Sequence, residues 1–509
     1  MFENQPKALY ALALANTGER FGYYTMIAVF SLFLRANFGL SGDTAGLIYG
    51  VFLALVYFLP LVGGIMADKF GYGKMVTIGI IVMFAGYLFL SIPLGGGVMG
   101  YAAMFGALLL VSLGTGLFKG NLQVMVGNLY DAPELSAKRD SGFSIFYMAI
   151  NIGALFAPTA AVRIKEWAEH SLGYSGNDAY HFSFAVACVS LIVSMMIYYA
   201  FRSTFKHVEA GAGKSKKTDT VGTEEELTPQ QTKERIVALC LVFAVVIFFW
   251  MSFHQNGLTL TFFADEFVSP KSEGVQTMAF DVINLVMIIF MIYSLMSFFQ
   301  SKTSKAKLIS TVVFLAAVGV LIYKYHNIGG PVDVSAPIFQ QFNPFYVVAL
   351  TPVSMAIFGA LAAKGKEPTA PRKIAYGMII AGSAYLLMVL ASRGLLTPNQ
   401  QDAAKAAGET VPFASGNWLI GTYLILTFGE LLLSPMGISF VSKVAPPKYK
   451  GTMMGGWFVA TAIGNLLVSV GGFLWNDIPL TIVWSVFIVL CLLSAGFMFL
   501  MMKRLEKVA

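Results

Sequence analysis

Apolar runs of about 20 residues recur along the whole of this 509-residue chain, and no other feature of the sequence limits its fold as strongly. A run of that length is what an α-helix needs to cross the hydrocarbon core of a bilayer. Only 12% of the residues are charged, about half of the ~25% usual in soluble domains. A transmembrane β-barrel would instead show short segments of alternating hydrophobicity. The sequence therefore predicts an all-α protein that crosses a membrane many times.

We read fourteen membrane-spanning helices from these runs. They are expected at about residues 8–35, 43–67, 74–94, 99–124, 139–161, 180–202, 235–257, 277–299, 307–325, 343–363, 374–393, 416–442, 451–474 and 479–503. With the N-terminus placed in the cytoplasm, the cytoplasmic loops carry most of the basic residues, from Lys69 and Lys74 to Lys503 and Arg504. This distribution is the bias that the positive-inside rule describes. We therefore expect an even number of spans and both termini in the cytoplasm.

Two similar segments indicate an internal repeat. The stretch "FYMAINIGAL" at 146–155 shares four identical positions with "WFVATAIGNL" at 457–466. Such repeats are expected of transporters whose central site lies between two similar halves. A linker at 203–234, rich in Gly, Lys, Thr and Glu, reads as a flexible tether between the halves. We expect one six-helix bundle at 1–202, a second at 235–509, and within it an inserted helix pair at about 277–325.

Several full charges fall inside the apolar spans. Glu19 and Arg20 lie in the first span, Lys119 in the fourth and Glu430 in the twelfth. Each would cost about 2.5–3.5 kcal/mol at the centre of a helix that faces lipid, so we expect them to face one another or a water-filled cavity. Arg20 and Lys119 would then form a basic pole and Glu430 an acidic pole. The two poles suit the carboxylate and the ammonium group of a short peptide.

Polar and aromatic residues in the same spans would hydrogen-bond the peptide. They are Tyr23, Tyr24, Tyr57, Asn151 and Asn343. In the alternative interpretation, the charges are structural ion pairs and the aromatic residues, with Trp457, only pack helices together. Glu19 has two expected partners, Arg20 and Lys119. We disfavour a purely structural pair of Glu19 with Arg20, because neighbours in sequence point to different faces of a helix.

Other classes of protein find little support. Cys188, Cys240 and Cys491 fall inside apolar runs and show neither a metal-binding spacing nor a disulfide pattern. The spans hold no paired aspartates, serine–histidine set or HExxH motif, so we expect no enzyme, no metal site and no cofactor. The net charge of +7 is explained by basic loops rather than by nucleic acid. No removable signal peptide is recognised, and nothing resembles the output domain of a receptor.

Several motifs resemble known families. The loop "GGIMADKFGYGK" at 63–74 is similar to a loop motif of the major facilitator superfamily, in which Gly63 and Gly64 allow close approach of helices. That resemblance implies a gating role for Asp68 at the cytoplasmic face. The stretch "NTGERFGYY" at 16–24 resembles the E-x-x-E-R-F-x-Y-Y motif of the proton-dependent oligopeptide transporter family. Further matches follow in the order of the family: "GTGLFKGN", "FYMAINIG", "FNPFYVVALTP", "GELLLSPMG" and "GTMMGGWF".

The resemblance implies a fold, an activity and a site. The fold is that of the major facilitator superfamily, with two extra helices. The activity is import of di- and tripeptides with protons by alternating access, with the proton gradient as its energy source. Separately, we expect a monomer, and because the sequence shows no eukaryotic targeting features we expect the cytoplasmic membrane of a bacterium. Peptide binding is assigned to Arg20, Tyr23, Tyr24, Tyr57, Lys119, Asn151, Asn343, Glu430 and Trp457. Proton coupling is assigned to Glu19, Lys119 and His254.

The chain departs from the pattern of this family at three positions. Asn16 stands where the family usually has a glutamate, Ile27 where it has an arginine, and His254 where it has an acidic residue. These changes leave open an uncoupled facilitator, or a carrier of another solute such as nitrate or an amino-acid derivative. Glu430 favours a zwitterion over an anion. For His254, a titrating role and a structural hydrogen bond to a neighbouring helix are both open.

Overall fold

The computed structural model describes residues 5–131, 133–136, 139–210, 227–446 and 449–508. Each of the fourteen predicted spans coincides with a helix, which confirms the all-α prediction. The long helices are α1 (Lys7–Phe38), α2 (Gly42–Phe70), α3 (Tyr72–Leu90), α4 (Val98–Asn128), α6 (Arg139–Leu172), α7 (Tyr180–Ala200), α8 (Pro229–Phe253), α11 (Val282–Gln300), α12 (Ser304–His326), α13 (Phe342–Ala363), α14 (Ala370–Ala391), α16 (Asn417–Val444), α17 (Lys450–Leu467) and α19 (Leu480–Val508).

Shorter elements connect these helices. They are α5 (Pro133–Ser136), α9 (Thr259–Phe267), α10 (Val275–Ala279), α15 (Pro398–Ala406), α18 (Ser469–Phe473) and the antiparallel strands β1 (Lys271–Ser272) and β2 (Val332–Asp333). Local chemistry explains several boundaries. Thr228 and Gln231 form a capping box that starts α8, and Gly39 ends α1 with a φ of 62°, a conformation that glycine adopts without strain.

Among the described residues, thirteen helical segments are long and apolar enough to cross a membrane. The α1 helix, with 32 residues, is long enough but is not one of the thirteen. We attribute this to the polar residues in its middle, which include Glu19 and Arg20 and lower its hydropathy. A multi-pass membrane protein follows from the thirteen helices alone.

The seventh predicted span is broken in the structure. After α8 comes a short 3-10 helix, His254–Gly257, and then α9. The sequence of this turn is "HQNG", and asparagine and glycine are weak helix formers. The break places His254 at the end of α8 rather than within a continuous helix.

The described residues form two compact units. The first comprises Met1–His254, Ile438–Phe473 and Lys503–Ala509, and the second Gln255–Gly437 and Leu474–Met502. The first unit thus includes α17 and α18 from late in the chain. The division into six-helix bundles at 1–202 and 235–509 stays a prediction.

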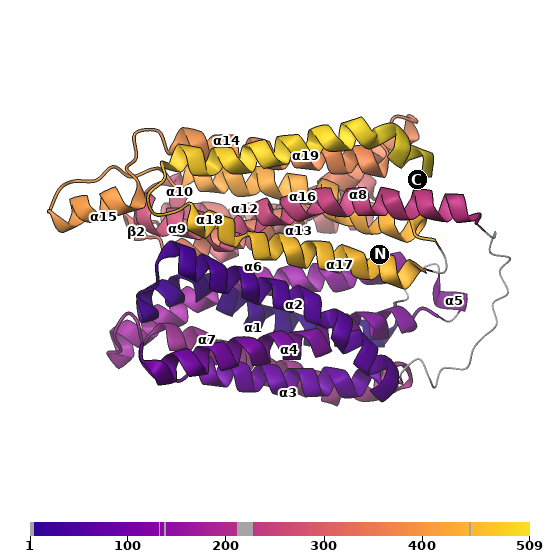
Figure 1. Ribbon diagram of the computed structural model, residues 1–509, viewed down its shortest axis with the longest axis horizontal. Coiled ribbons are helices and arrows are strands. Elements are labelled where there is room, and N and C mark those ends of the chain that lie inside the picture. Colours follow the sequence, from indigo (N-terminus) through magenta and orange to yellow (C-terminus); the bar gives the residue numbers. More distant parts are fainter. Residues whose placement is uncertain (1–4, 132, 137–138, 211–226, 447–448, 509) are drawn as a thin grey trace. The chain divides into compact units, whose positions relative to one another are not determined.

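Within the first unit, α1 packs along α6 and α7, and α4 packs along both α2 and α3 (Figure 1). The closest approach follows the glycine motif at the end of α2. A Cβ atom at Gly63 would lie 2.1 Å from the carbonyl oxygen of Gly116 on α4, whereas one at Gly64 would meet no heavy atom within 4 Å. Close helix approach is therefore confirmed for Gly63 and not for Gly64.

The first unit also holds α17 and α18 against α2. A Cβ atom at Gly50 of α2 would lie 2.8 Å from the carbonyl oxygen of Leu466, and one at Gly472 would lie 2.5 Å from that of Gly42. Because glycine lets these backbones touch, α17 and α18 belong to the same unit as α2. This packing brings residues of α17 to the N-terminal helices.

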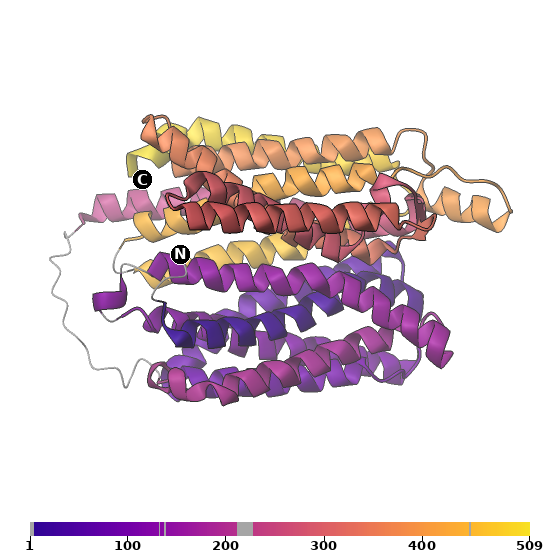
Figure 2. The same cartoon turned by 180° about the vertical axis from the view of Figure 1, so that it is seen from behind.

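Within the second unit, the predicted extra pair is the helical hairpin α11–α12. The two helices pack on each other, and α11 packs on α13, where the Tyr293 hydroxyl donates to the carbonyl oxygen of Val348 at 3.1 Å. An ion pair of Lys324 with Asp281 ties their ends together. In the view of Figure 2 the pair lies on the near side of this unit. Only 11% of the most apolar 18-residue stretch of α12 is buried, so the surface of this helix is suited to contact with lipid.

Candidate functional site

Glu19 and Arg20 form a buried ion pair in the middle of α1. Arg20 Nε lies 2.5 Å from Glu19 Oε2, and Arg20 Nη2 lies 2.5 Å from Glu19 Oε1. The side chains are 0% and 3% exposed. Of the two partners expected for Glu19, the structure shows Arg20, because both side chains are long enough to turn toward each other although they are neighbours in sequence. A two-bond geometry of this kind is the strongest that arginine makes with a carboxylate.

Aromatic rings of α1 lie beside this ion pair. The guanidinium carbon of Arg20 lies 4.6 Å from the ring centroid of Tyr23, within the range of a cation–π contact. Tyr23 is buried, and its ring meets that of Tyr24 edge to face at 5.3 Å. Two predicted tyrosines therefore lie where the first span was expected to place them.

A second set of predicted residues joins α4, α2 and α8. Lys119 Nζ lies 4.0 Å from the ring centroid of Tyr57. The Tyr57 ring lies 6.1 Å from the imidazole of His254. His254 Nδ1 in turn lies 2.5 Å from Asn465 Oδ1 on α17. These contacts form a continuous chain of side chains from four helices.

The two sets belong to one cluster. Lys119 lies within electrostatic range of both Arg20 and Glu19, and His254 lies within electrostatic range of Lys119. Because Glu19 pairs with Arg20, Lys119 is a further basic side chain in this group without a carboxylate of its own among these described residues. We call Glu19, Arg20, Tyr57, Lys119 and His254 the basic cluster.

Glu430 is held by a different pair of partners in the second unit. Asn343 Nδ2 donates to Glu430 Oε2 at 2.9 Å and to Thr427 Oγ1 at 3.0 Å. Glu430 is 8% exposed, and among the described residues no basic group pairs with its carboxylate. A buried carboxylate without a cationic partner is costly. This site is therefore suited to receive a cation.

The remaining predicted residues are placed as follows. Asn151 is buried and donates from Nδ2 to the carbonyl oxygen of Tyr147 in its own helix, at 3.1 Å. Trp457 is buried on α17. Asp68 accepts a hydrogen bond from the Tyr72 hydroxyl at 2.6 Å, so it joins the end of α2 to the start of α3.

Two positions that depart from the family pattern are buried on α1. Ile27 is 7% exposed and lies in the apolar core. Asn16 is 3% exposed, and its Nδ2 has no hydrogen-bond partner among the described residues. Neither position carries a charge into the core.

Sequence reasoning missed two residues of the site, Asn465 and Thr427. Both are polar residues within apolar spans, a class that usually has a partner or a function there. In the internal repeat, Asn465 replaces Ala154 of the first copy. This polar residue in place of an alanine is the feature of the sequence by which Asn465 could have been identified as a candidate.

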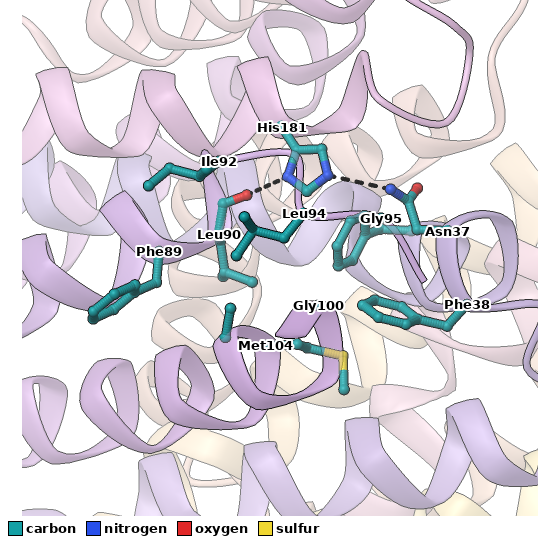
Figure 3. Close-up of a pocket in the computed structure, with 12 residues that line it drawn as sticks. Asn37, Phe38, Phe89, Leu90, Ile92, Leu94, Gly95, Gly100, Met104 and His181 are labelled. Carbon is teal, nitrogen blue, oxygen red and sulfur yellow. Dashed lines mark hydrogen bonds between the residues drawn. The ribbon is translucent and has the colours of Figure 1, made fainter. Parts of the chain in front are cut away.

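A separate pocket lies at one end of the first unit, where α1 and α3 end and α4 begins. His181 on α7 bonds the carbonyl oxygen of Leu90 through Nδ1 and lies 3.2 Å from Asn37 Nδ2 through Nε2 (Figure 3). Phe38 and Met104 line the apolar side of the pocket. None of the predicted site residues lines it. Among the described residues, no three His, Cys, Asp or Glu side chains gather as they would around a metal ion.

Comparisons with known proteins agree with one another. A family model described as the POT family matches residues 73–223 and 325–483. Dipeptide and tripeptide permease B of Xenorhabdus bovienii is 27% identical over 481 residues, which cover 92% of this chain and 86% of that protein. A di-/tripeptide transporter of Lactococcus lactis is 28% identical over 499 residues, 92% of this chain and 89% of that protein. The fold is similar to that in a crystal structure of a peptide transporter POT in complex with sulfate, with a TM-score of 0.74 and 22% sequence identity. The superposed region covers 100% of this chain and 96% of the chain in that crystal structure.

Proposed function

Because the chain belongs to the POT family, we propose that it is a secondary transporter that imports di- and tripeptides with protons by alternating access. The names of the relatives in Xenorhabdus and Lactococcus support a peptide substrate. Transport of this kind requires no bond to be made or broken in the substrate, so we propose no enzymatic activity. The cytoplasmic placement of both termini rests on the loop charges.

One observation supports this proposal most strongly, the complementary charge of the two sets of residues. The basic cluster holds a basic side chain, Lys119, beyond the paired Glu19 and Arg20, and the buried carboxyl group of Glu430 has no basic partner among the described residues. A peptide has a carboxylate for the first and an ammonium group for the second. An anion such as nitrate would satisfy only one of them.

The proposed binding roles follow from this charge. Lys119 and Arg20 would bind the carboxylate of the peptide, and Glu430, held in place by Asn343, would bind its ammonium group. The Asn343 amide is a hydrogen-bond donor to Glu430, so we assign it to orienting that carboxylate as well as to binding. Tyr23, Tyr24, Tyr57, Asn151 and Trp457 remain proposed peptide-binding residues.

Proton coupling is proposed for the basic cluster. Glu19 can take up a proton when Arg20 or Lys119 turns to the substrate, because a buried carboxylate that loses its cation is costly while charged. His254 is a second group that can titrate, since imidazole has an ordinary pKa near 6.5. We propose that one of these two groups carries the proton that accompanies the peptide.

An uncoupled facilitator is the second candidate. It is favoured by the hydrogen bond of His254 to the neutral Asn465, because a histidine held in this way can be purely structural. The two candidates differ only in whether a proton gradient drives accumulation of the peptide.

Uptake by purified protein in liposomes tests the proposal. We expect dialanine to accumulate when an inward proton gradient is imposed, and we expect Glu430→Gln to abolish most of this uptake. Equilibration without accumulation would favour the facilitator. Absence of uptake for every short peptide, with nitrate or another solute carried instead by the Glu430→Gln protein, would refute peptide transport.

A further inference from the structure

Asn465 is hydrogen-bonded to His254, and it has no role in the peptide binding or proton coupling proposed above. We propose that Asn465 is a positioning residue that fixes which nitrogen of His254 carries its proton and which one remains free to bind a second proton. This inference deepens the proposed function and rests on it for the transport readout. The structural part of the inference can be tested separately.

The geometry around His254 leaves its ring little freedom. Trp250 stacks on the imidazole, with ring centroids 5.1 Å apart and an angle of 18° between the planes. Phe253 meets the ring edge to face at 5.4 Å. The ring is thus held in one plane, and Asn465 Oδ1 lies 2.5 Å from Nδ1 in that arrangement.

The hydrogen bond decides the tautomer. An amide oxygen can only accept a hydrogen bond, so Nδ1 must donate and therefore carries the proton of the neutral ring. Nε2 is then the nitrogen with the lone pair. This is the same logic by which a partner on one imidazole nitrogen sets the role of the other in many functional histidines.

Within the part of the chain that the structure describes, Asn465 has no competing side-chain partner. Its side chain is fully buried, and its Nδ2 has no hydrogen-bond partner among the described residues. A buried polar atom without a partner is uncommon and asks for an explanation. Among the described residues, the contact with His254 is therefore the one side-chain hydrogen bond of Asn465.

The groups around His254 make its uptake of a second proton depend on binding of the peptide. From α8 it faces Trp250 and Phe253, from α2 Tyr57, and from α17 Asn465, while Lys119 on α4 lies within electrostatic range. Of these groups only Lys119 is charged. An imidazolium beside this ammonium is disfavoured by repulsion, and a peptide carboxylate bound at Lys119 would relieve it. Proton uptake at Nε2 would then accompany binding of the peptide.

Nitrogen-15 NMR of histidine-labelled protein tests the tautomer without any substrate. The chain has only 5 histidines, so the His254 signals can be assigned by comparison with His254→Gln. We expect a neutral ring protonated at Nδ1 in the wild-type protein and a mixture of tautomers in Asn465→Leu. A ring protonated at Nε2, or wild-type signals that Asn465→Leu leaves unchanged, would overturn the proposal.

Transport of dialanine tests the consequence. Loss of one hydrogen bond predicts that Asn465→Leu raises KM about three- to tenfold and alters the dependence of uptake on pH. An aspartate at this position would hold His254 as an imidazolium, so Asn465→Asp should flatten that pH dependence. Thr461→Val is the matched control, because Thr461 is buried one turn away on α17 and its hydroxyl donates, among the described residues, to the carbonyl oxygen of Trp457 alone.

A double-mutant cycle separates positioning from packing. If Asn465 acts through His254, the effect of Asn465→Leu should disappear in a His254→Gln background. An equal effect in both backgrounds, or a pH profile identical to that of Thr461→Val, would refute the role. If the wild-type protein carried no peptide, the proposed function would fail, while the NMR result would still decide the tautomer.

Discussion

Replacing Asn343 by leucine should weaken peptide binding through its effect on Glu430. Leucine has a similar size but no hydrogen-bond donor, so Asn343→Leu removes the bond from Nδ2 to Glu430 Oε2, which is 2.9 Å long. Hydrogen bonds to charged groups are worth about 1.5–3 kcal/mol. At about 1.4 kcal/mol for each factor of ten, the Kd for dialanine should rise at least tenfold.

Calorimetry or a ligand-induced shift in thermal unfolding of purified protein measures this change. Thr427→Val is the matched control, since it removes the other partner of the Asn343 amide and leaves the bond to Glu430 in place. We expect this control to change the Kd much less than Asn343→Leu does. In a Glu430→Gln background, Asn343→Leu should have a smaller effect, limited to any direct contact of Asn343 with the peptide. A wild-type Kd in Asn343→Leu would refute the reasoning.

Two further predictions concern stability. Gly63→Val should lower the midpoint of thermal unfolding strongly, because a Cβ atom there would lie 2.1 Å from the backbone oxygen of Gly116. Gly64→Val is the control and should unfold as the wild type does, because a Cβ atom at Gly64 would meet no heavy atom within 4 Å. Equal midpoints for the two variants would contradict the packing of α2 on α4. Glu19→Met should destabilise the protein by about 3–5 kcal/mol, since it leaves the Arg20 guanidinium buried and unpaired. The double variant with Arg20→Met should recover most of that loss in denaturant unfolding, because it removes the unpaired charge. A double variant no more stable than Glu19→Met would contradict this account.

The length of the apolar runs was sufficient to predict the long helices. A segment of about 20 apolar residues has few alternatives to a spanning helix, and all fourteen predicted spans are helical. Details that depend on single residues were missed. The span predicted to end at 257 is interrupted after Phe253 and continues as α9 to Phe267. Most of the predicted linker, 211–226, lies outside the described residues.

The burial of the candidate residues could be predicted better than their pairing. Charges stand out in an apolar sequence, so Glu19, Lys119 and Glu430 were identified from their positions inside the spans and from the resemblance of the motifs that contain them. Which partner each takes depends on side-chain conformations and on contacts between distant segments. His254 and Asn465 are 211 residues apart in sequence, and no local pattern in a single sequence links them.

The assignment of Glu430 to the ammonium group is tested most directly by peptides with blocked termini. Binding of dialanine, N-acetyl-dialanine and dialanine amide would be compared in wild-type protein and in Glu430→Gln. We expect the wild type to bind free dialanine most tightly. The Glu430→Gln protein should no longer distinguish dialanine from its N-acetyl form, and it should still disfavour the amide. If Glu430→Gln kept the full preference for a free ammonium group, Glu430 would not be its binding partner.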